Sequence, residues 1–188
     1  MSDPLLRYLQ RHSTPAKALT EPAPDDAQLR DIIEIAMHAP DHKRLRPYRF
    51  MPIRGDARYR LSEIFVQATR QREPDVDPAY LAKQREKPLR APLIVVVIAS
   101  LIDEDKVPEI EQILTAGAAT HGLMLAANAL GFGSIWLTGA NAYDDHVCTA
   151  LGITGSERII GFVYLGTPEL EIPSRELPPV DDFIREWS

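Results

Sequence analysis

The chain has 188 residues, of which 45% are hydrophobic and 26% are charged. These values are typical of a soluble globular protein, and the length suits one domain over residues 1–188. The formal net charge of -6 excludes a general electrostatic affinity for nucleic acid or for an anionic membrane, so any anion site must be a local concentration of basic groups.

The compartment is indicated by what the sequence lacks. The N-terminal residues do not show the basic segment followed by an apolar segment that marks a signal peptide, and no apolar run reaches the roughly 18 residues of a membrane span. The single cysteine, Cys148, excludes an internal disulfide and suits a reducing compartment. We therefore expect a cytoplasmic protein that binds neither nucleic acid nor membrane, with Cys148 as a packed, inert thiol.

Two helices are expected near the N-terminus. Apolar residues mark a short helix over residues 5–9, and the proline-rich stretch 13–26 reads as a loop. A second helix is expected over 26–37, because apolar residues recur there at helical spacing and an aspartate precedes it as a cap. Pro40 ends this helix, since proline disfavours helical backbone in the residue before it.

The middle of the chain predicts two strands and two helices. Residues 48–55 read as a strand, in which Pro52 favours a sheet edge because proline has no N–H for the ladder. The segments 57–71 and 76–88 read as helices, and the second is highly charged. Residues 93–100, LIVVVIAS, form an uninterrupted and mainly β-branched run, which is typical of a strand buried on both faces.

The C-terminal half begins with a long helix, expected over residues 107–130. This helix is apolar nearly all round, and its alanines and glycines permit the close approach of another helix. A strand over 134–137, a helix that carries Cys148 and a strand over 158–166 follow. Helices outnumber strands, so the elements predict an α+β or α/β domain in which helices cover one small sheet.

The C-terminal tail, about residues 170–188, is rich in proline and carries Phe183, Ile184 and Trp187 near its end. Apolar residues in this position need a surface to cover. The tail therefore either folds back on its own core or lies across a second subunit, and we favour packing on a partner subunit.

Three segments carry residues that could bind an anion or a cofactor. The first consists of Arg11, His12 and Ser13, at the end of the first expected helix. A guanidinium beside a serine hydroxyl suits a phosphate group. Cations are also favoured at a solvated helix C-terminus without any ligand, so the tripeptide alone leaves both interpretations open.

The second segment is a concentration of basic residues after the helix over 26–37. Six side chains within twelve positions are cationic or can become so: His38, His42, Lys43, Arg44, Arg46 and Arg49. Two of the histidines have the i, i+4 spacing of a zinc site, but a proline lies between them and positive neighbours disfavour a divalent cation. The segment therefore predicts an anion site and no metal.

The third segment is GFGSIWLTG, residues 131–139. Its glycines follow a helix and precede a strand, whereas a Rossmann site needs a strand, a glycine turn and a helix in that order. The strand instead directs Trp136, Leu137 and Thr138 toward a site, or packs them in the core. No nucleophile triad, P-loop or acid–base carboxylate pair stands out, so an enzyme with these residues would take its chemistry from a cofactor.

In this order and spacing the segments resemble the nitroreductase family of FMN-dependent flavoproteins, and within it the short bacterial branch. The resemblance rests on RHS at 11–13, APDHK…PY at 39–48, GFGSIW…G at 131–139 and GFVYLGTP at 161–168, and it extends from about residue 5 to 170. It implies an α+β fold with a central, mainly antiparallel sheet flanked by helices. It also implies a homodimer with two FMN sites at the subunit interface.

The resemblance assigns roles to particular residues. Three segments match the flavin-binding positions of the family: Arg11, His12 and Ser13 at the phosphate and ribityl chain, His38, His42 and Arg44 reaching the flavin, often from the partner subunit, and Trp136, Leu137 and Thr138 along the ring. The stretch that matches nicotinamide-nucleotide binding comprises Ala126, Ala127, Asn128, Ala129, Leu130 and Gly131.

The chain departs from the family pattern in its basic residues. Arg44, Arg46 and Tyr48 stand where Asn, Gln and Trp are common, which adds positive charge near the flavin. His12 stands where a second arginine is common, so phosphate binding should weaken as His12 loses its proton. Arg175 is a candidate for the basic phosphate contact near the C-terminus of larger relatives.

The implied function is that of an FMN-dependent NAD(P)H oxidoreductase, or nitroreductase, acting on a nitroaromatic, a quinone or a similar acceptor. No side chain is needed as a catalytic nucleophile. The alternatives are a flavin-binding or storage protein without turnover, an enzyme that consumes its flavin on the same scaffold, and an adaptor that binds no cofactor. The sequence leaves the acceptor and the choice between NADH and NADPH open.

Overall fold

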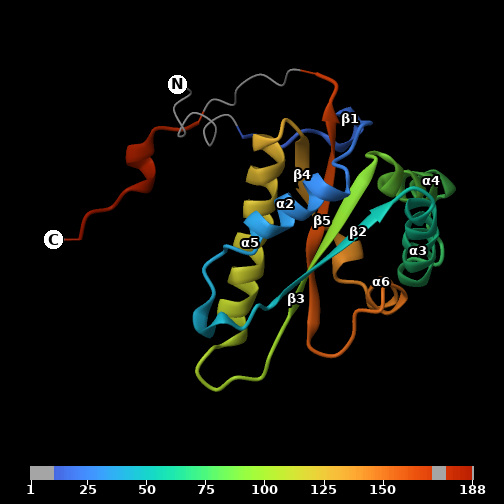
Figure 1. Ribbon diagram of the computed structural model, residues 1–188. Helices are drawn as coiled ribbons and strands as arrows, with labels where there is room; N and C mark the ends of the chain where they lie inside the picture. Colours follow the sequence, from blue (N-terminus) through green and yellow to red (C-terminus); the bar gives the residue numbers. More distant parts are fainter. Residues whose placement is uncertain (1–10, 171–176, 188) are drawn as a thin grey trace.

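The computed structural model describes residues 11–170 and 177–187 (Figure 1). The helix expected over residues 5–9 and the candidate Arg175 lie outside the described residues. Among the described residues, no helix is both long and apolar enough to cross a membrane.

A twisted sheet forms the centre of the fold (Figure 1). Its strands are β1 (Leu19–Thr20), β2 (Tyr48–Arg54), β3 (Leu93–Ser100), β4 (Gly133–Leu137) and β5 (Glu157–Pro168). Strand β5 pairs with β1, β3 and β4, and β3 also pairs with β2. Every strand pair in the described part of the chain is antiparallel, which confirms the expected mainly antiparallel sheet.

Helices cover both faces of the sheet. Helices α2 (Asp26–Ala36) and α5 (Glu109–Ala129) lie on one face, and α3 (Ala57–Arg72) and α6 (Asp145–Ala150) lie on the other. Helix α4 (Pro78–Glu86) packs against α3. The structure also contains short 3₁₀ turns: η1 (Ala16–Ala18), η2 (His42–Arg44), η3 (Lys87–Leu89), η4 (Ala140–Ala142) and η5 (Val180–Phe183).

Strand β3 separates the two halves of the core. Its alternate residues point to opposite faces, so Val95 and Val97 pack toward α2 and α5, whereas Ile94 and Val96 pack toward α3 and α6. All four side chains are fully buried. The expectation of a strand buried on both faces is confirmed, and Pro52 is accommodated because β2 has a sheet neighbour on one side only.

One local feature fixes the start of α2, and another permits its close packing against α5. Asp25 and Gln28 form a reciprocal capping box at the start of α2, in which the Gln28 N–H donates to the Asp25 carboxylate at 2.8 Å. At their crossing, a Cβ on Gly122 would lie 3.3 Å from the Cα of Ala36. Glycine at this position therefore permits the close helix approach that the small residues of α5 predicted.

The structure corrects two expected boundaries. The stretch 13–26 is not wholly a loop, because it contains η1 and β1, and Leu19 of β1 pairs with Pro168 of β5. Helix α5 begins at Glu109 and not at 107, because Pro108 takes the cap position with extended backbone. The proline before α5 is a local signal, whereas a two-residue strand such as β1 depends on its distant partner and could not be read locally.

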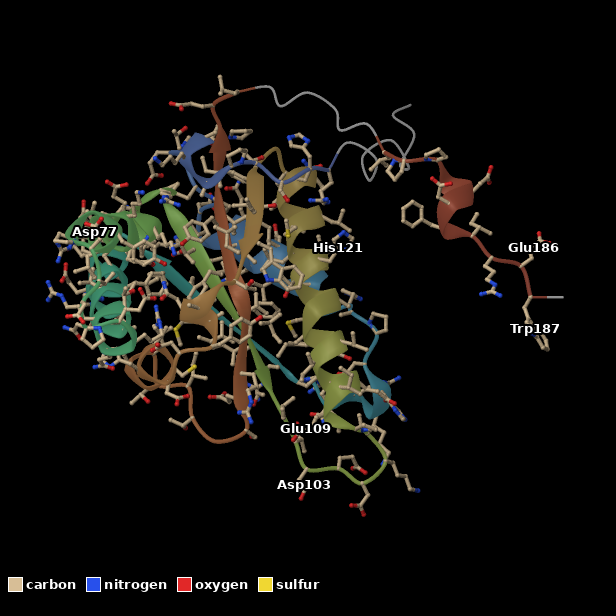
Figure 2. All side chains as sticks on the ribbon, turned by 180° about the vertical axis from the view of Figure 1, so that it is seen from behind. Asp77, Asp103, Glu109, His121, Glu186 and Trp187 are labelled. Carbon is tan, nitrogen blue, oxygen red and sulfur yellow. The ribbon has the colours of Figure 1, made fainter. Side chains whose placement is uncertain are left out.

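The described part of the tail, residues 177–187, extends away from the body of the protein (Figure 1). All its large apolar side chains are exposed, and Trp187 is 101% exposed (Figure 2). The structure therefore does not show the tail folded back on its own core. Its packing on a partner subunit stays a prediction.

Candidate functional site

The N-terminal segment lies beside the start of β4. The Thr14 N–H donates to the Ser134 carbonyl oxygen at 2.9 Å, and Thr14 is buried. A Cβ on Gly133 would lie 2.8 Å from the Thr14 hydroxyl oxygen and 2.7 Å from Leu19, so glycine is required for this approach. The predicted residues Arg11, half-buried, and Ser13, exposed, directly precede this contact.

A cavity of about 450 Å³ opens at this end of β4, and its lining includes His12, Asn128 and Gly131. The structure thus brings one residue of the predicted phosphate segment next to two of the predicted nicotinamide segment. Ala126 and Ala127 of the same segment are buried in the core, so their side chains face away from this cavity. A ligand in this cavity would contact Asn128, the backbone near Gly131 and His12.

The three residues predicted to run along a flavin ring do not share one face. Trp136 pairs with Val163 and points toward α5, whereas Leu137 pairs with Phe162 and points toward α3. The reason is the two-residue period of a strand. Thr138, just after the strand, lines cavities on both sides.

On the α3 side, a cavity of about 340 Å³ lies at the end of β4, where Leu137 and Thr138 meet Lys87 and Arg90. Burial lowers the pKa of Lys87, and the nearby charges of Arg90 and Arg72 lower it further. The Nε atom of Arg90 is buried and has no hydrogen-bond partner among the described residues. No carboxylate lines this cavity, so it is suited to an anion or to an electron-rich carbonyl group.

Lys87 and Arg90 were not singled out from the sequence. They lie in EKPLRAP, which reads as the charged end of a helix before a buried strand. Their position was the one sequence feature that could have pointed to them, because basic residues immediately before a strand buried on both faces must lie at one end of the sheet. Which residues they would meet there could not be read from this segment.

A hydrogen-bonded network holds the wall of this cavity in place. Arg72, from the end of α3, donates to the Asp144 carboxylate and, at 3.1 Å, to the side-chain oxygen of Asn141. Asn141 also donates to Gln84 of α4 at 3.4 Å, and Asp144 caps α6 by accepting from the Val147 N–H at 3.0 Å. The turn after β4 is thereby tied to α3, α4 and α6.

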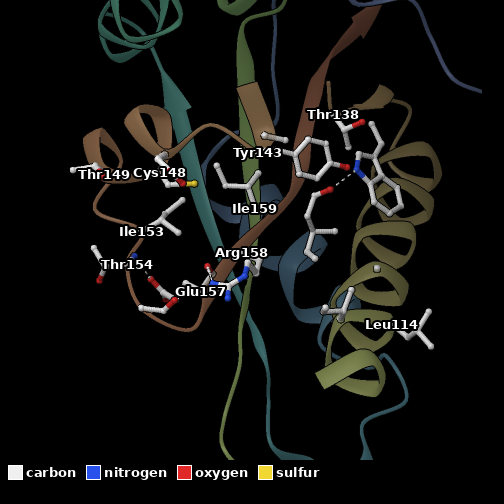
Figure 3. A pocket seen from close by; sticks show the side chains of 17 residues that line it. Leu114, Thr138, Tyr143, Cys148, Thr149, Ile153, Thr154, Glu157, Arg158 and Ile159 are labelled. Atoms are coloured by element: carbon white, nitrogen blue, oxygen red, sulfur yellow. Dashed lines mark hydrogen bonds between the residues drawn. The ribbon is translucent and has the colours of Figure 1, made fainter. Parts of the chain in front are cut away.

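A second cavity, of about 1060 Å³, is lined by residues of α5 on one face of the sheet and of α6 on the other face (Figure 3). Trp136 forms part of its wall: its indole N–H donates to the Ile160 carbonyl oxygen at 3.1 Å. A Cβ on Gly161 would collide with this indole, so glycine allows the ring to lie on β5. The half-buried Cys148 also lines the cavity, and burial with the charges of Asp145 and Asp144 raises the pKa of its thiol, which disfavours the nucleophilic thiolate.

The basic segment after α2 lies apart from these cavities, beside the N-terminal half of α5 (Figure 1). His42 Nδ1 is 2.8 Å from the Glu111 carboxylate, and Thr115 donates to the Pro40 carbonyl oxygen at 2.9 Å. His38 and Arg44 are exposed. Within one chain, therefore, the predicted flavin residues fall at both ends of β4 and on a separate loop, and in the described ranges no group of His, Cys, Asp or Glu is placed to hold a metal ion.

Comparison with known proteins identifies relatives of this chain. It matches the nitroreductase family over residues 8–167. It is 41% identical over 169 residues to the Escherichia coli K12 protein named "Putative NAD(P)H nitroreductase YdjA", covering 90% of each chain. Its fold is similar to a nitroreductase-like protein from Bacillus cereus, with a TM-score of 0.82, 19% identity and coverage of 100% and 97% of the two chains. It is also similar to a nitroreductase from Desulfovibrio desulfuricans solved in complex with FMN, with a TM-score of 0.75, 24% identity and coverage of 100% and 99%.

Proposed function

The chain belongs to the nitroreductase family, and we propose that it is an FMN-dependent NAD(P)H oxidoreductase. Bound FMN would supply the redox chemistry, taking a hydride from NADH or NADPH and passing electrons to a nitroaromatic, a quinone or a similar acceptor. The observation that carries the proposal is the cationic, carboxylate-free cavity at the end of β4, in which Lys87 and Arg90 meet Leu137 and Thr138.

The residues of this cavity fit the electron-rich edge of an isoalloxazine ring. Among the described residues, the half-buried Lys87 has no ion-pair partner and the Arg90 Nε has no acceptor. Both groups are held by the fold before any ligand binds, which is the arrangement required to stabilise negative charge in a dry site. Their role would be to bind the ring and to favour its reduced, more negative form.

The opposite end of β4 fits the phosphate. The segment Arg11–Ser13 adjoins Ser134 through Thr14, and Thr138 borders the cationic cavity. Four to five extended residues separate these two ends, roughly 15 Å, which is comparable with the length of an extended FMN molecule. Arg11 and Ser13 would hold the phosphate, and Lys87 the far edge of the ring, with the flavin lying along β4.

A homodimer is supported by the exposed face of α5. Ile110 and Leu114 are 59% and 64% exposed, and Ala118 and His121 continue the same face at helical spacing. Trp136 and Tyr143 extend the apolar surface on one side. A second copy of the chain is the occupant that the proposal commits to, because the family resemblance implies two subunits and the surface is mainly apolar and uncharged.

Two-fold symmetry would then complete the site. The basic loop contacts α5 through Glu111 and Thr115, whereas the large cavity is lined from α5 by Ile113, Leu114 and Gly117, on the other side of the exposed stripe. In a dimer whose two-fold axis runs along the stripe, parallel to α5, the symmetry exchanges the two sides of the stripe. The partner's loop would therefore lie over this chain's cavity near Thr138, which explains why the predicted flavin residues do not meet within one chain.

The tail provides a test of this dimer. Ending the chain before Pro178 removes four exposed large apolar residues: Val180, Phe183, Ile184 and Trp187. We expect the dimer dissociation constant, measured by analytical ultracentrifugation, to rise by at least about tenfold, since buried aromatic anchors dominate interfaces. Arg185→Gln in the full chain is the control and should leave association unchanged. An equally tight dimer after truncation would exclude the tail from the interface.

The proposed function is tested by anaerobic spectroscopy of the purified protein with FMN. We expect NADH or NADPH to bleach the visible flavin band, and an added quinone or nitroaromatic to restore it. A protein that binds FMN but is not bleached would be a storage protein. Loss of the flavin itself in air would indicate a flavin-consuming enzyme. A protein that does not bind FMN would refute the proposal.

A further inference from the structure

The basic loop has an unusual backbone. Lys43, Arg44 and Arg46 all have positive φ angles, of 60°, 54° and 51°. Residues with a side chain rarely adopt this left-handed conformation because the Cβ atom crowds the backbone. Three such residues within four positions persist only where surrounding contacts hold them, and strained backbone of this kind is concentrated at functional sites.

The contacts that hold the loop come from its own aspartate. The Asp41 carboxylate accepts from the Leu45 N–H at 3.1 Å and from the Arg46 N–H at 2.7 Å. The Arg44 N–H donates to the Asp41 carbonyl oxygen at 3.1 Å. From Arg44 to Arg46 the backbone is left-handed, right-handed and left-handed, an alternation that points successive N–H groups inward, and here those of Leu45 and Arg46 point to the Asp41 carboxylate.

Further contacts anchor the loop to α5 and to the segment before it. His42 is paired with Glu111, and the Lys43 ammonium lies 2.6 Å from the Glu104 carboxylate. The segment that carries Glu104 is itself fixed, because the buried Gln112 accepts from the Ile102 N–H at 2.9 Å and donates to the Ile102 carbonyl oxygen at 2.8 Å. The loop is therefore anchored both to α5 and to the segment before α5.

Two guanidinium groups of the loop have no partner among the described residues. Arg44 and Arg46 are both exposed, and neither guanidinium makes a hydrogen bond or lies within 4.0 Å of a carboxylate among the described residues. The nearby Glu104 and Glu111 are engaged with Lys43 and His42. In a chain of net charge -6, two unpaired guanidiniums, two positions apart on a backbone held by the contacts above, are suited to an anion.

We propose that Arg44 and Arg46 bind the 2′-phosphate of NADPH and make it the preferred donor over NADH. This inference rests on the proposed function, in which the loop lies over the partner's cavity. NADPH differs from NADH by this one phosphate, and arginine is the residue that accommodates a 2′-phosphate in dinucleotide sites generally. A guanidinium pairs with phosphate through two parallel hydrogen bonds, so two of them discriminate strongly by charge and geometry.

The flavin phosphate is the other anion that these arginines could meet. Its site is proposed at the far end of β4, next to Thr14 and Ser134, and not at the loop. The experiment must therefore separate the two phosphates. Adenosine 2′,5′-bisphosphate carries the distinguishing phosphate without a nicotinamide, and 5′-AMP is its matched probe without that group.

The experiment is calorimetric titration of the FMN-loaded protein with each probe. We expect the wild type to bind the bisphosphate about ten- to a hundredfold more tightly than 5′-AMP, with a preference that falls as salt rises. The double variant Arg44→Ala/Arg46→Ala should lose most of this preference while keeping its affinity for 5′-AMP. Arg54→Ala is the control, because Arg54 is an exposed arginine paired with Asp26 on another part of the surface.

Steady-state kinetics provide the second readout. In the double variant, the ratio of kcat/KM for NADPH to kcat/KM for NADH should fall toward one, a readout that a general effect on the flavin would not change. Equal binding of the two probes by the wild type would overturn the inference, as would a preference that survives the double substitution. Loss of FMN or of the dimer in the double variant, with the probe preference intact, would also overturn it. Failure of both nucleotides to bleach the flavin would instead refute the proposed function, while the probe titration still reports on the two arginines.

Discussion

Replacing Lys87 with methionine is expected to weaken FMN binding by about ten- to a hundredfold, because a hydrogen bond from a charged donor contributes roughly 1.5–3 kcal/mol. The same change should not destabilise the apoprotein. Burial and the neighbouring Arg90 and Arg72 lower the pKa of Lys87, so its charged form is disfavoured in the fold. Below that folded pKa the ammonium therefore costs stability, and removing it should leave the apoprotein as stable as the wild type or more so.

The effect of Lys87→Met on FMN affinity and its effect on the stability of the apoprotein are measured separately. Fluorescence titration reports the affinity for FMN, and thermal unfolding of the flavin-free protein reports stability. Lys83→Met is the matched control, since Lys83 is an exposed lysine on α4. Unchanged FMN affinity in Lys87→Met would remove the cavity from the flavin site. Reduced affinity with a strongly destabilised apoprotein would show that Lys87 is structural.

Replacing Asp144 with asparagine is expected to lower the free energy of unfolding by about 2–4 kcal/mol, since it leaves the Arg72 guanidinium without its anion. The estimate lies below that for a fully buried pair because the Arg72 side chain is 27% exposed, against 8% for Asp144. Asn141 shares Arg72, so the turn after β4 should loosen and FMN affinity should fall as well.

The pH dependence of the stability difference between wild type and Asp144→Asn tests whether the Arg72–Asp144 ion pair is its cause. Burial opposes ionisation of Asp144, but the hydrogen bonds from Arg72 and from the Val147 N–H outweigh it and lower its pKa. The stabilisation is therefore fully present above the ordinary aspartate pKa, about 3.9, and is lost as the pH falls through the folded value. The stability gap between wild type and Asp144→Asn should be constant near neutrality and close in acid. Asp145→Asn is the control, and a gap that does not change with pH would contradict the ion-pair explanation.

Several elements were predictable because their signals are local. The β-branched run of β3, the aspartate cap of α2 and the proline in β2 each act within a few residues of their own position. The structure confirms all three: β3 is buried on both faces, α2 begins after its capping box and β2 has one sheet neighbour. The order of the basic loop, the GFG turn and the last strand was likewise sufficient to indicate the family.

Which residues make up the candidate site could be determined only from the tertiary structure. Trp136 and Leu137 are neighbours in the chain, yet the strand directs them to different cavities, and Lys87 joins Leu137 and Thr138 although 50 positions separate it from Leu137. Pairings of this kind depend on which strands become neighbours, and that choice is made by burial of the whole sheet. Local patterns thus specified the elements and the chemistry of the basic loop. The packing of distant segments specified which charged groups were left without partners, and so where a ligand can bind.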